Sequence, residues 1–347
     1  MDLESLGWDA SFADSFRPHA DDGLAPARVA VEHRSEYVLY SAHGELRAEL
    51  SGRLRLDGQQ PAVGDWVAIR PRPDEGRATI QAVLERRSAF MRKVPWLEVK
   101  AQVVAANVDV VFIVVGLDGN FNVRRMERYL TLAWESGAQP VVLLTKADLC
   151  DDVDARVFES EAVAIGVPVH AVSAPTGDGV ELVRSYVPAG KTAALLGSSG
   201  VGKSTLVNAL VGEELLATRE VREDSRGRHT TTQRQLVPLP HGGLVLDTPG
   251  MRELQLWDAD GGLDTTFADV QSFAAQCRFA DCAHGREPGC AVRAALADGT
   301  LDVERFESWR KLERELEHLE LKQDAHARSE ARKERRRFAR SLRKTSY

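Results

Sequence analysis

The stretch Gly197-Ser198-Ser199-Gly200-Val201-Gly202-Lys203-Ser204 determines which fold class this chain can adopt. It directly follows the apolar segment 193–196 and matches the pattern Gly-x4-Gly-Lys-Ser/Thr, in which a strand passes through a phosphate-binding loop into a helix. The glycines let backbone N–H groups surround phosphates, and the positive end of the following helix adds to the attraction. The alternative is an ordinary glycine-rich turn with an incidental lysine, but such a turn would not need an apolar strand before it and a helix after it. We therefore expect nucleotide contacts along the whole loop and at Thr205, with Lys203 at the β- and γ-phosphates and Ser204 on Mg²⁺.

A second element that responds to phosphate lies downstream, in Leu244-Val245-Leu246-Asp247-Thr248-Pro249-Gly250. Asp247 ends an apolar strand, where its carboxylate can hold Mg²⁺ through water, and the amide of Gly250 can contact the γ-phosphate. Alone, Asp-Thr-Pro-Gly would be an ordinary turn, but after a phosphate loop it indicates a switch. The next residue is Met251, where related enzymes often have a glutamine that orients the attacking water. Slow intrinsic turnover is expected as a result.

The polar segment Arg226-Gly227-Arg228-His229-Thr230-Thr231-Thr232 lies between these two elements. A segment at this place is typical of a loop in which a threonine closes over Mg²⁺ and the γ-phosphate. Any of the three threonines could serve. We favour Thr231, as a magnesium contact besides Ser204 and as a catalytic residue alongside Lys203.

Base recognition is indicated by Thr145-Lys146-Ala147-Asp148, which ends an apolar strand. The carboxylate of Asp148 can accept two hydrogen bonds from guanine N1–H and its exocyclic amine, a donor pair that adenine lacks. Lys146 would lie along the base. The usual motif begins with Asn, and Thr145 offers a hydroxyl in place of an amide, so its contribution to the site is open. Ser173-Ala174, at the end of a later strand, fits the remaining loop that contacts the base.

The order of these motifs is itself informative. An ordinary Ras-like GTPase has the phosphate loop first and the base-recognition motifs last, whereas here Asp148 and Ser173 precede Lys203 and Asp247. Joining the old ends of such a domain and opening a surface loop preserves its packing, so the same parallel sheet can form. We therefore predict a circularly permuted α/β GTPase domain that uses Mg²⁺ with GTP. The expected helices are 123–137, 151–165 and 178–186, and the expected strands are 108–115, 140–144, 167–172 and 192–196.

The segment 28–88 has a different texture, with short strands separated by turn signals. Five short strands within this span fit a small closed barrel, with an OB-fold as the leading interpretation. Spacing alone does not separate an OB-fold from an SH3-like barrel. The expected strands are 29–31, 37–40, 46–50, 66–69 and 78–84.

Three of the four cysteines fall close together, in the pattern Cys277-x4-Cys282-x-His284-x5-Cys290. Three thiolates and one imidazole at this spacing suit tetrahedral Zn²⁺, and four protein ligands leave no position free for catalysis. We therefore expect one structural zinc ion per chain. Reduced buried cysteines beside a surface histidine are the alternative, and Cys150 lies outside the pattern as an ordinary free thiol. Residues 303–328 follow as an expected helix with an apolar packing stripe.

The composition limits the class of protein. With 43% hydrophobic and 28% charged residues among 347, the chain is balanced like a globular protein of two or three domains. No stretch approaches the roughly 20 apolar residues that span a bilayer, and the acidic start Met1-Asp2-Leu3-Glu4 is unlike a signal peptide. The net charge is −7, yet residues 331–347 contain eight Lys/Arg and one Glu. Such a basic tail can bind phosphates, although charge alone would favour a solvated helix end.

Together these features resemble the ribosome small subunit-dependent GTPase A family, also called the RsgA or YjeQ family. The resemblance covers nearly the whole chain and includes the barrel segment Val63-Gly64-Asp65-Trp66-Val67, the permuted motifs, the segment 227–232 and the cysteine cluster. It implies late small-subunit maturation in the bacterial cytoplasm, rRNA binding and one zinc ion. It also implies that His229 positions the attacking water, in a loop that the ribosome could order. A plain contact of His229 with phosphate or solvent is the alternative.

The sequence thus predicts three parts. An N-terminal extension and an OB-fold RNA-binding barrel cover 1–95, the permuted GTPase domain covers 96–260, and a mostly helical zinc-binding domain with a basic arm covers 261–347. The expected function is ribosome-stimulated hydrolysis of GTP to GDP and phosphate by a cytoplasmic monomer that binds the small ribosomal subunit and its rRNA and no membrane. Two other functions stay open. An RNA-binding module could use the nucleotide only as a regulatory clamp, and a P-loop enzyme could use ATP, although Asp148 argues against ATP.

Overall fold

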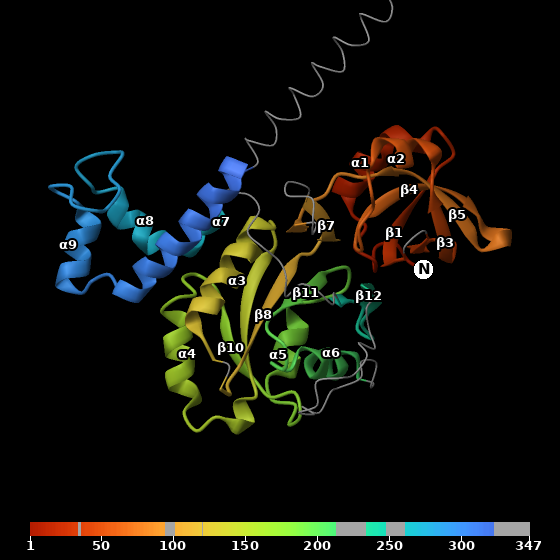
Figure 1. Ribbon diagram of the computed structural model, residues 1–347. Coiled ribbons are helices and arrows are strands. Elements are labelled where there is room, and N and C mark those ends of the chain that lie inside the picture. Colours follow the sequence, from red (N-terminus) through yellow and green to blue (C-terminus); the bar gives the residue numbers. More distant parts are fainter. Residues whose placement is uncertain (34–35, 94–100, 120, 213–233, 248–260, 323–347) are drawn as a thin grey trace, which may run out of the picture. The chain divides into compact units, whose positions relative to one another are not determined.

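The computed structural model of the chain describes all residues except 34–35, 94–100, 120, 213–233, 248–260 and 323–347 (Figure 1). The chain divides into two compact units. The first unit contains Met1–Met91 and Val103–Leu254, and the second contains Arg92–Gln102 and Gln255–Tyr347. A β-barrel and the α/β domain with the phosphate loop belong to the first unit, and the cysteine cluster belongs to the second.

The N-terminal part of the first unit is a closed five-stranded barrel. Its strands pair in the order β1-β2-β3-β5-β4 and back to β1, with β3 and β5 parallel and the other pairs antiparallel. This arrangement confirms the predicted OB-fold. The strands are β1 (Ala25–Glu32), β2 (Tyr37–Ser41), β3 (Gly44–Leu50), β4 (Trp66–Arg72) and β5 (Arg77–Val83), with α2 (Gly52–Asp57) and the 3-10 turn η1 (Pro73–Glu75) between them.

Alternating residues of the strands fill the barrel, because successive side chains of a strand point to opposite faces. Val67 and Ile69 of β4, for example, are both fully buried. The helix α1 (Ala10–Ala20) precedes the barrel and begins after Asp9, whose carboxylate accepts hydrogen bonds from two amides of the first turn. The ring of Phe12 lies 5.8 Å from that of the buried Trp66, so the N-terminal extension packs on the barrel.

The α/β domain is built on a sheet in the order β10-β9-β8-β11-β13-β12. All neighbouring pairs are parallel except β13 and β12. The strand that precedes the phosphate loop, β11, lies in the interior of this order, as a Ras-like sheet requires despite the permuted motif order. The strands are β8 (Val110–Gly116), β9 (Gln139–Thr145), β10 (Val169–Val172), β11 (Thr192–Leu196), β12 (Gln235–Pro238) and β13 (Leu244–Asp247).

Helices cover both faces of this sheet, α3 and α4 one face and α5 and α6 the other (Figure 1). Every residue of β8 is buried for this reason, which explains its unbroken apolar run. Phe112 and Val114 share a core with Val183 of α5 and Leu206 of α6. The helices are α3 (Val123–Glu135), α4 (Val153–Glu161), α5 (Val180–Ser185) and α6 (Lys203–Val211).

Barrel and α/β domain share a continuous sheet. Residues 25–28 of β1 pair with β4 and close the barrel, whereas Val31, further along the same edge, pairs with Gln235 of β12. The strands of the barrel and those of the α/β domain thereby form one eleven-stranded sheet. Two more strands, β6 (Ala89–Lys93) and β7 (Ala101–Ala106), pair with each other.

The second unit is helical in its described part, with α7 (Gly262–Thr266), α8 (Ala268–Ala274), α9 (Ala291–Asp298) and a further helix over 303–322. Phe306, Trp309, Leu312 and Leu316 are buried along the last helix, so the expected apolar stripe is a packing surface. Arg305 is buried as well, and its guanidinium pairs with the carboxylate of Asp269 at 2.5 and 2.9 Å. Among the helices that the structure describes, none is both long and apolar enough to cross a membrane.

Candidate nucleotide and metal sites

The parallel strands place the predicted nucleotide motifs at one edge of the sheet. In a parallel sheet all carboxyl ends lie on the same side, which is where α/β proteins bind their ligands. Thr145 ends β9, Ser173 directly follows β10, Gly197 directly follows β11, and Asp247 ends β13. Four segments that are far apart in the sequence thus meet at this edge.

The phosphate loop connects β11 to α6, and close packing of its backbone requires glycine. Gly197, Gly200 and Gly202 all have positive φ values, of 158°, 78° and 95°. A Cβ atom on Gly197 would lie 2.4 Å from the carbonyl oxygen of Val114, so any larger residue would push the loop off β8. The Nζ atom of Lys203 donates hydrogen bonds to the carbonyls of Gly197 (2.8 Å) and Ser198 (2.5 Å), which holds the ammonium group against the loop.

The two base-recognition motifs meet through a direct hydrogen bond. Asp148 lies in the 3-10 turn η2 (Ala147–Leu149), and its Oδ1 accepts a 2.6 Å hydrogen bond from Oγ of the buried Ser173. The Asp148 carboxylate is exposed at this edge. The serine fixes one carboxylate oxygen and leaves further lone pairs for two donors of a base, which is the chemistry that guanine offers.

Thr145 contacts the phosphate loop. Its side chain is only 3% exposed, and its hydroxyl donates a 2.5 Å hydrogen bond to the carbonyl of Val201, with the carbonyl of Val115 at 3.3 Å as a second acceptor within reach. Lys146, the next residue, adopts a left-handed conformation with φ 61°. Its Nζ atom lies 2.5 Å from Oδ2 of Asp118, which orients the long side chain across this edge of the sheet.

Two polar residues of this edge escaped the motif-based sequence analysis. Asp118 pairs with Lys146, and Arg125, in the first turn of α3, donates a 2.8 Å hydrogen bond from Nη1 to Oγ of Ser198 in the phosphate loop. Both follow β8, a fully buried strand between β9 and β11. Polar residues just beyond the carboxyl end of such a strand were the available signal, because that end faces the ligand edge.

Several predicted site residues lie outside the described residues. These are His229, Thr231 and Gly250, together with Met251. For Asp247 the structure gives the backbone, which pairs with β12 at Gln235. Ser204 and Thr205 lie in the first turn of α6, directly after Lys203, with Ser204 exposed toward solvent.

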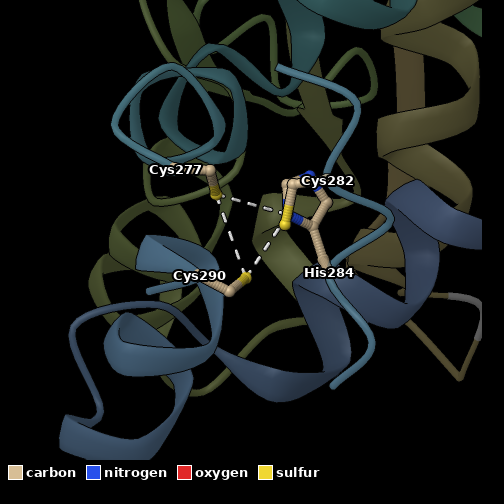
Figure 2. A group of neighbouring side chains, drawn as sticks. All are labelled: Cys277, Cys282, His284 and Cys290. Atoms are coloured by element: carbon tan, nitrogen blue, oxygen red, sulfur yellow. Dashed lines mark hydrogen bonds between the residues drawn. The ribbon is translucent and has the colours of Figure 1, made fainter. Parts of the chain in front are cut away.

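The four residues of the cysteine cluster converge, as Figure 2 shows. The four potential ligand atoms of Cys277, Cys282, His284 and Cys290 lie within 4.8 Å of one another. The Nδ1 atom of His284 lies 3.6 Å from Sγ of Cys277 and 3.6 Å from Sγ of Cys290, and these two sulfur atoms are 3.9 Å apart. Tetrahedral zinc with ordinary bond lengths would separate two sulfurs by about 3.8 Å and sulfur from nitrogen by about 3.6 Å. The group can therefore hold a metal ion.

The surrounding structure prepares this cluster. Oε2 of Glu287 accepts a 2.7 Å hydrogen bond from the amide of Gly285 and thereby shapes the loop beside His284. Burial raises the pKa of the Cys277 thiol, but hydrogen bonds from the first amides of α9 and from the neighbouring thiols of Cys282 and Cys290 outweigh this effect and lower the pKa, whereas burial raises the pKa of Cys282 to about 11. A lowered pKa favours the thiolate, which is the form that binds metals. The His284 ring packs 5.8 Å from Trp309, so the last described helix supports the cluster.

The parallel sheet, the phosphate loop and the Asp148–Ser173 pair define a P-loop GTPase whose motifs run in circularly permuted order. A family model described as RsgA GTPase matches residues 83–257. A model described as ABC transporter also matches residues 180–342, a smaller share of the chain that includes the phosphate loop common to P-loop proteins.

Individual proteins agree with the first of these models. The "Small ribosomal subunit biogenesis GTPase RsgA" of Opitutus terrae is 50% identical over 329 residues, which cover 91% of this chain and 90% of that protein. The crystal structure of YjeQ from Thermotoga maritima matches with a TM-score of 0.65 at 31% identity, over 84% of this chain and 98% of the other. YloQ, described as a circularly permuted GTPase, has a TM-score of 0.63 at 23% identity and shares the fold. The chain belongs to the RsgA GTPase family and is a GTP-hydrolysing enzyme.

Proposed function

We propose that this enzyme binds the small ribosomal subunit and acts in its late maturation, hydrolysing GTP to GDP and phosphate when the subunit stimulates it. The observation that carries this proposal is the match to a small ribosomal subunit biogenesis GTPase over nine-tenths of both chains. The nucleotide edge of the sheet supports it, because the phosphate loop and the base-recognition residues lie together there.

The nucleotide roles in this proposal rest on the chemistry of the residues and on their places in the sequence motifs. Asp148 recognises guanine, Lys146 lies along the base, and Ala174 with Ser173 completes the base pocket. The backbone of the phosphate loop and Lys203 bind the phosphates, with Thr205 in the first turn of α6. Ser204 and Thr231 hold Mg²⁺, with Asp247 acting through water and Gly250 at the γ-phosphate. When bound, Mg²⁺ neutralises charge on the β- and γ-phosphates.

Water activation is assigned to His229, from sequence alone. Met251 has no hydrogen-bonding group that could orient water, so the enzyme needs another residue for this step. His229 has an imidazole that can accept a proton or a hydrogen bond from water. The segment around it is rich in Arg, Gly and Thr, with no apolar residue to anchor it. We infer that contact with the small subunit sets its position.

The metal of the cysteine cluster is zinc in this proposal. Three sulfurs and one imidazole nitrogen match the ligand preference of Zn²⁺, and a closed set of four ligands serves structure and leaves catalysis to the other unit. The ion would hold the loop 277–290 against Trp309 and α9. Its contribution is to the folding of the second unit, because such sites are rarely formed without their metal.

The remaining parts would hold the subunit. We propose that the OB-fold barrel within 1–95 and the basic arm 331–347 both contact rRNA. In sequence they lie before and after the GTPase domain of 96–260, and the arm belongs to the zinc-binding domain of 261–347. The eight Lys/Arg of the arm offer phosphate contacts. The protein would act as a monomer in the cytoplasm, where small subunits are assembled.

Sedimentation with purified small subunits tests this proposal. We expect the full chain to co-sediment more strongly with a non-hydrolysable GTP analogue than with GDP. Removal of 331–347 should weaken binding and reduce the salt dependence, by about 0.7 in the log–log slope for each lost phosphate contact. If the full chain stays in the supernatant both with the GTP analogue and with GDP, the proposed function is wrong. An unchanged slope after truncation would mean that the arm does not contact rRNA.

A further inference from the structure

One backbone position lies between the barrel and the proposed magnesium aspartate. Gln235, the first residue of β12, pairs with Val31 of β1 on one side and with Asp247 of β13 on the other. Val31 belongs to the barrel, and Asp247 ends the strand that reaches the nucleotide edge. A single row across three strands therefore runs from the barrel to the nucleotide site.

Side chains reinforce this row on both sides of Gln235. Arg234 precedes it, and its Nη1 atom lies 3.1 Å from Oε2 of Glu32, which follows Val31. The two side chains are only 17% and 19% exposed, so solvent screens their attraction less than that of a surface pair. Leu236 follows Gln235, and its carbonyl accepts a 3.5 Å hydrogen bond from the hydroxyl of Tyr40 in β2.

We propose that this junction couples the barrel to the nucleotide site, with Glu32 and Arg234 as its positioning residues. The inference rests on the proposed function, because the barrel ligand is taken to be rRNA of the small subunit. Hydrogen-bonded strands of one sheet move together, so a barrel held by RNA sets the position of β12 through Val31. The position of β12 in turn sets the position of the Asp247 backbone, because Gln235 of β12 pairs with Asp247.

The Glu32–Arg234 pair makes this coupling stronger than the backbone contact alone would. The carboxylate belongs to the barrel and the guanidinium to the α/β domain, and each fixes the other beside the Val31–Gln235 pair. Without the charge on Glu32, β1 could shift without moving Arg234. Coupling between two sites is reciprocal in binding, so the nucleotide should also change the affinity for the subunit.

Charge removal at the junction tests the proposal in the full chain. In Glu32→Gln and Arg234→Gln, the ratio of turnover at saturating small subunits to turnover without subunits should fall at least about fivefold. The charge-swapped double variant Glu32→Arg with Arg234→Glu should recover most of the ratio, which loss of folding could not explain. Glu159→Gln is the control, because Glu159 pairs with Arg156 at 2.8 Å within α4, where both side chains are about half exposed, and should keep the full ratio.

A second readout uses binding alone. The preference of small subunits for the protein with a GTP analogue over the protein with GDP should shrink in Glu32→Gln and return in the swapped variant. A wild-type ratio in both single variants would overturn the inference and leave the proposed function standing. A wild-type enzyme that small subunits neither bind nor stimulate would overturn the proposed function and this inference with it.

Discussion

The side-chain hydroxyl of Thr145 donates a 2.5 Å hydrogen bond to the carbonyl oxygen of Val201. Thr145 opens the base-recognition motif at the end of β9, and Val201 lies in the phosphate loop. Both side chains are buried, at 3% and 1% exposure, so water does not compete well for this contact. The segments proposed to bind the two ends of a nucleotide are thus held together, and a hydroxyl makes the contact at the position where the usual motif has Asn.

Loss of this hydroxyl should weaken nucleotide binding. Thr145→Val keeps the shape of the side chain but deprives a buried carbonyl of its donor, which costs about 1–3 kcal/mol. We expect GTP and GDP to bind about five- to a hundredfold more weakly in equilibrium titrations. Both nucleotides should be affected alike, because the contact does not involve the γ-phosphate. Thr145→Ser retains the hydroxyl as a control, and equal affinities of the Val and Ser variants would contradict this role.

Exchange of the Asp148 carboxylate, which we propose recognises guanine, should change base preference. In Asp148→Asn an NH2 group replaces one carboxylate oxygen, so it cannot accept from a guanine donor, but it can donate to the additional carbonyl of xanthine. We expect GTP to bind about ten- to a hundredfold more weakly and xanthosine triphosphate to bind better than GTP. Competition titration with both nucleotides measures the switch. Unchanged GTP affinity in this variant would show that Asp148 does not recognise guanine.

The cysteine cluster should hold one zinc ion that stabilises the second unit. Elemental analysis of protein purified without chelator should give one zinc per chain, and Cys282→Ser should lose it. Hydrogen exchange in 261–322 should then rise, because Trp309 and α9 pack on the cluster. Cys150→Ser is the control and should keep its zinc, since Cys150 follows the guanine motif in the other unit. Wild-type protein without zinc would rule the site out.

Much of the α/β domain could be predicted because its strands are buried on both faces. Such strands form unbroken apolar runs, and the expected strand 192–196 coincides with β11 (Thr192–Leu196). The expected helix 151–165 was too long, since α4 covers Val153–Glu161. Helix ends depend on capping contacts, here the carboxylate of Asp152 with the amide of Ala155.

The contacts between distant segments could not be predicted from the sequence. The pairing of Val31 with Gln235 depends on how the barrel and the α/β domain meet, and no local pattern encodes it. Arg125 carries no motif, and only the fold brings it to Ser198. The cysteine cluster could be predicted from the sequence, by contrast, because its four residues lie within a short stretch of chain whose spacing itself indicates metal binding.

Substitution of the proposed water-positioning histidine should separate binding from catalysis. His229→Ala keeps the phosphate loop, Asp148 and the barrel, so nucleotide and subunit affinities should stay within about twofold of wild type. Turnover at saturating subunits should fall by about 10²–10⁴, the usual contribution of a positioned acid–base group. Single-turnover phosphate release at saturating subunits measures this step. A His229→Ala enzyme with full stimulated turnover would show that another group activates the water.

GTP turnover with and without purified small ribosomal subunits decides whether the subunit activates this enzyme. The enzyme has a phosphate loop and a guanine motif, yet Met251 stands where a water-orienting glutamine is common. An externally supplied element raises the rates of other GTPases by about 10³–10⁵, so strong stimulation is physically reasonable. We predict slow turnover alone and at least about tenfold faster turnover with subunits. Equal turnover in both conditions would show that the small subunit does not activate this enzyme.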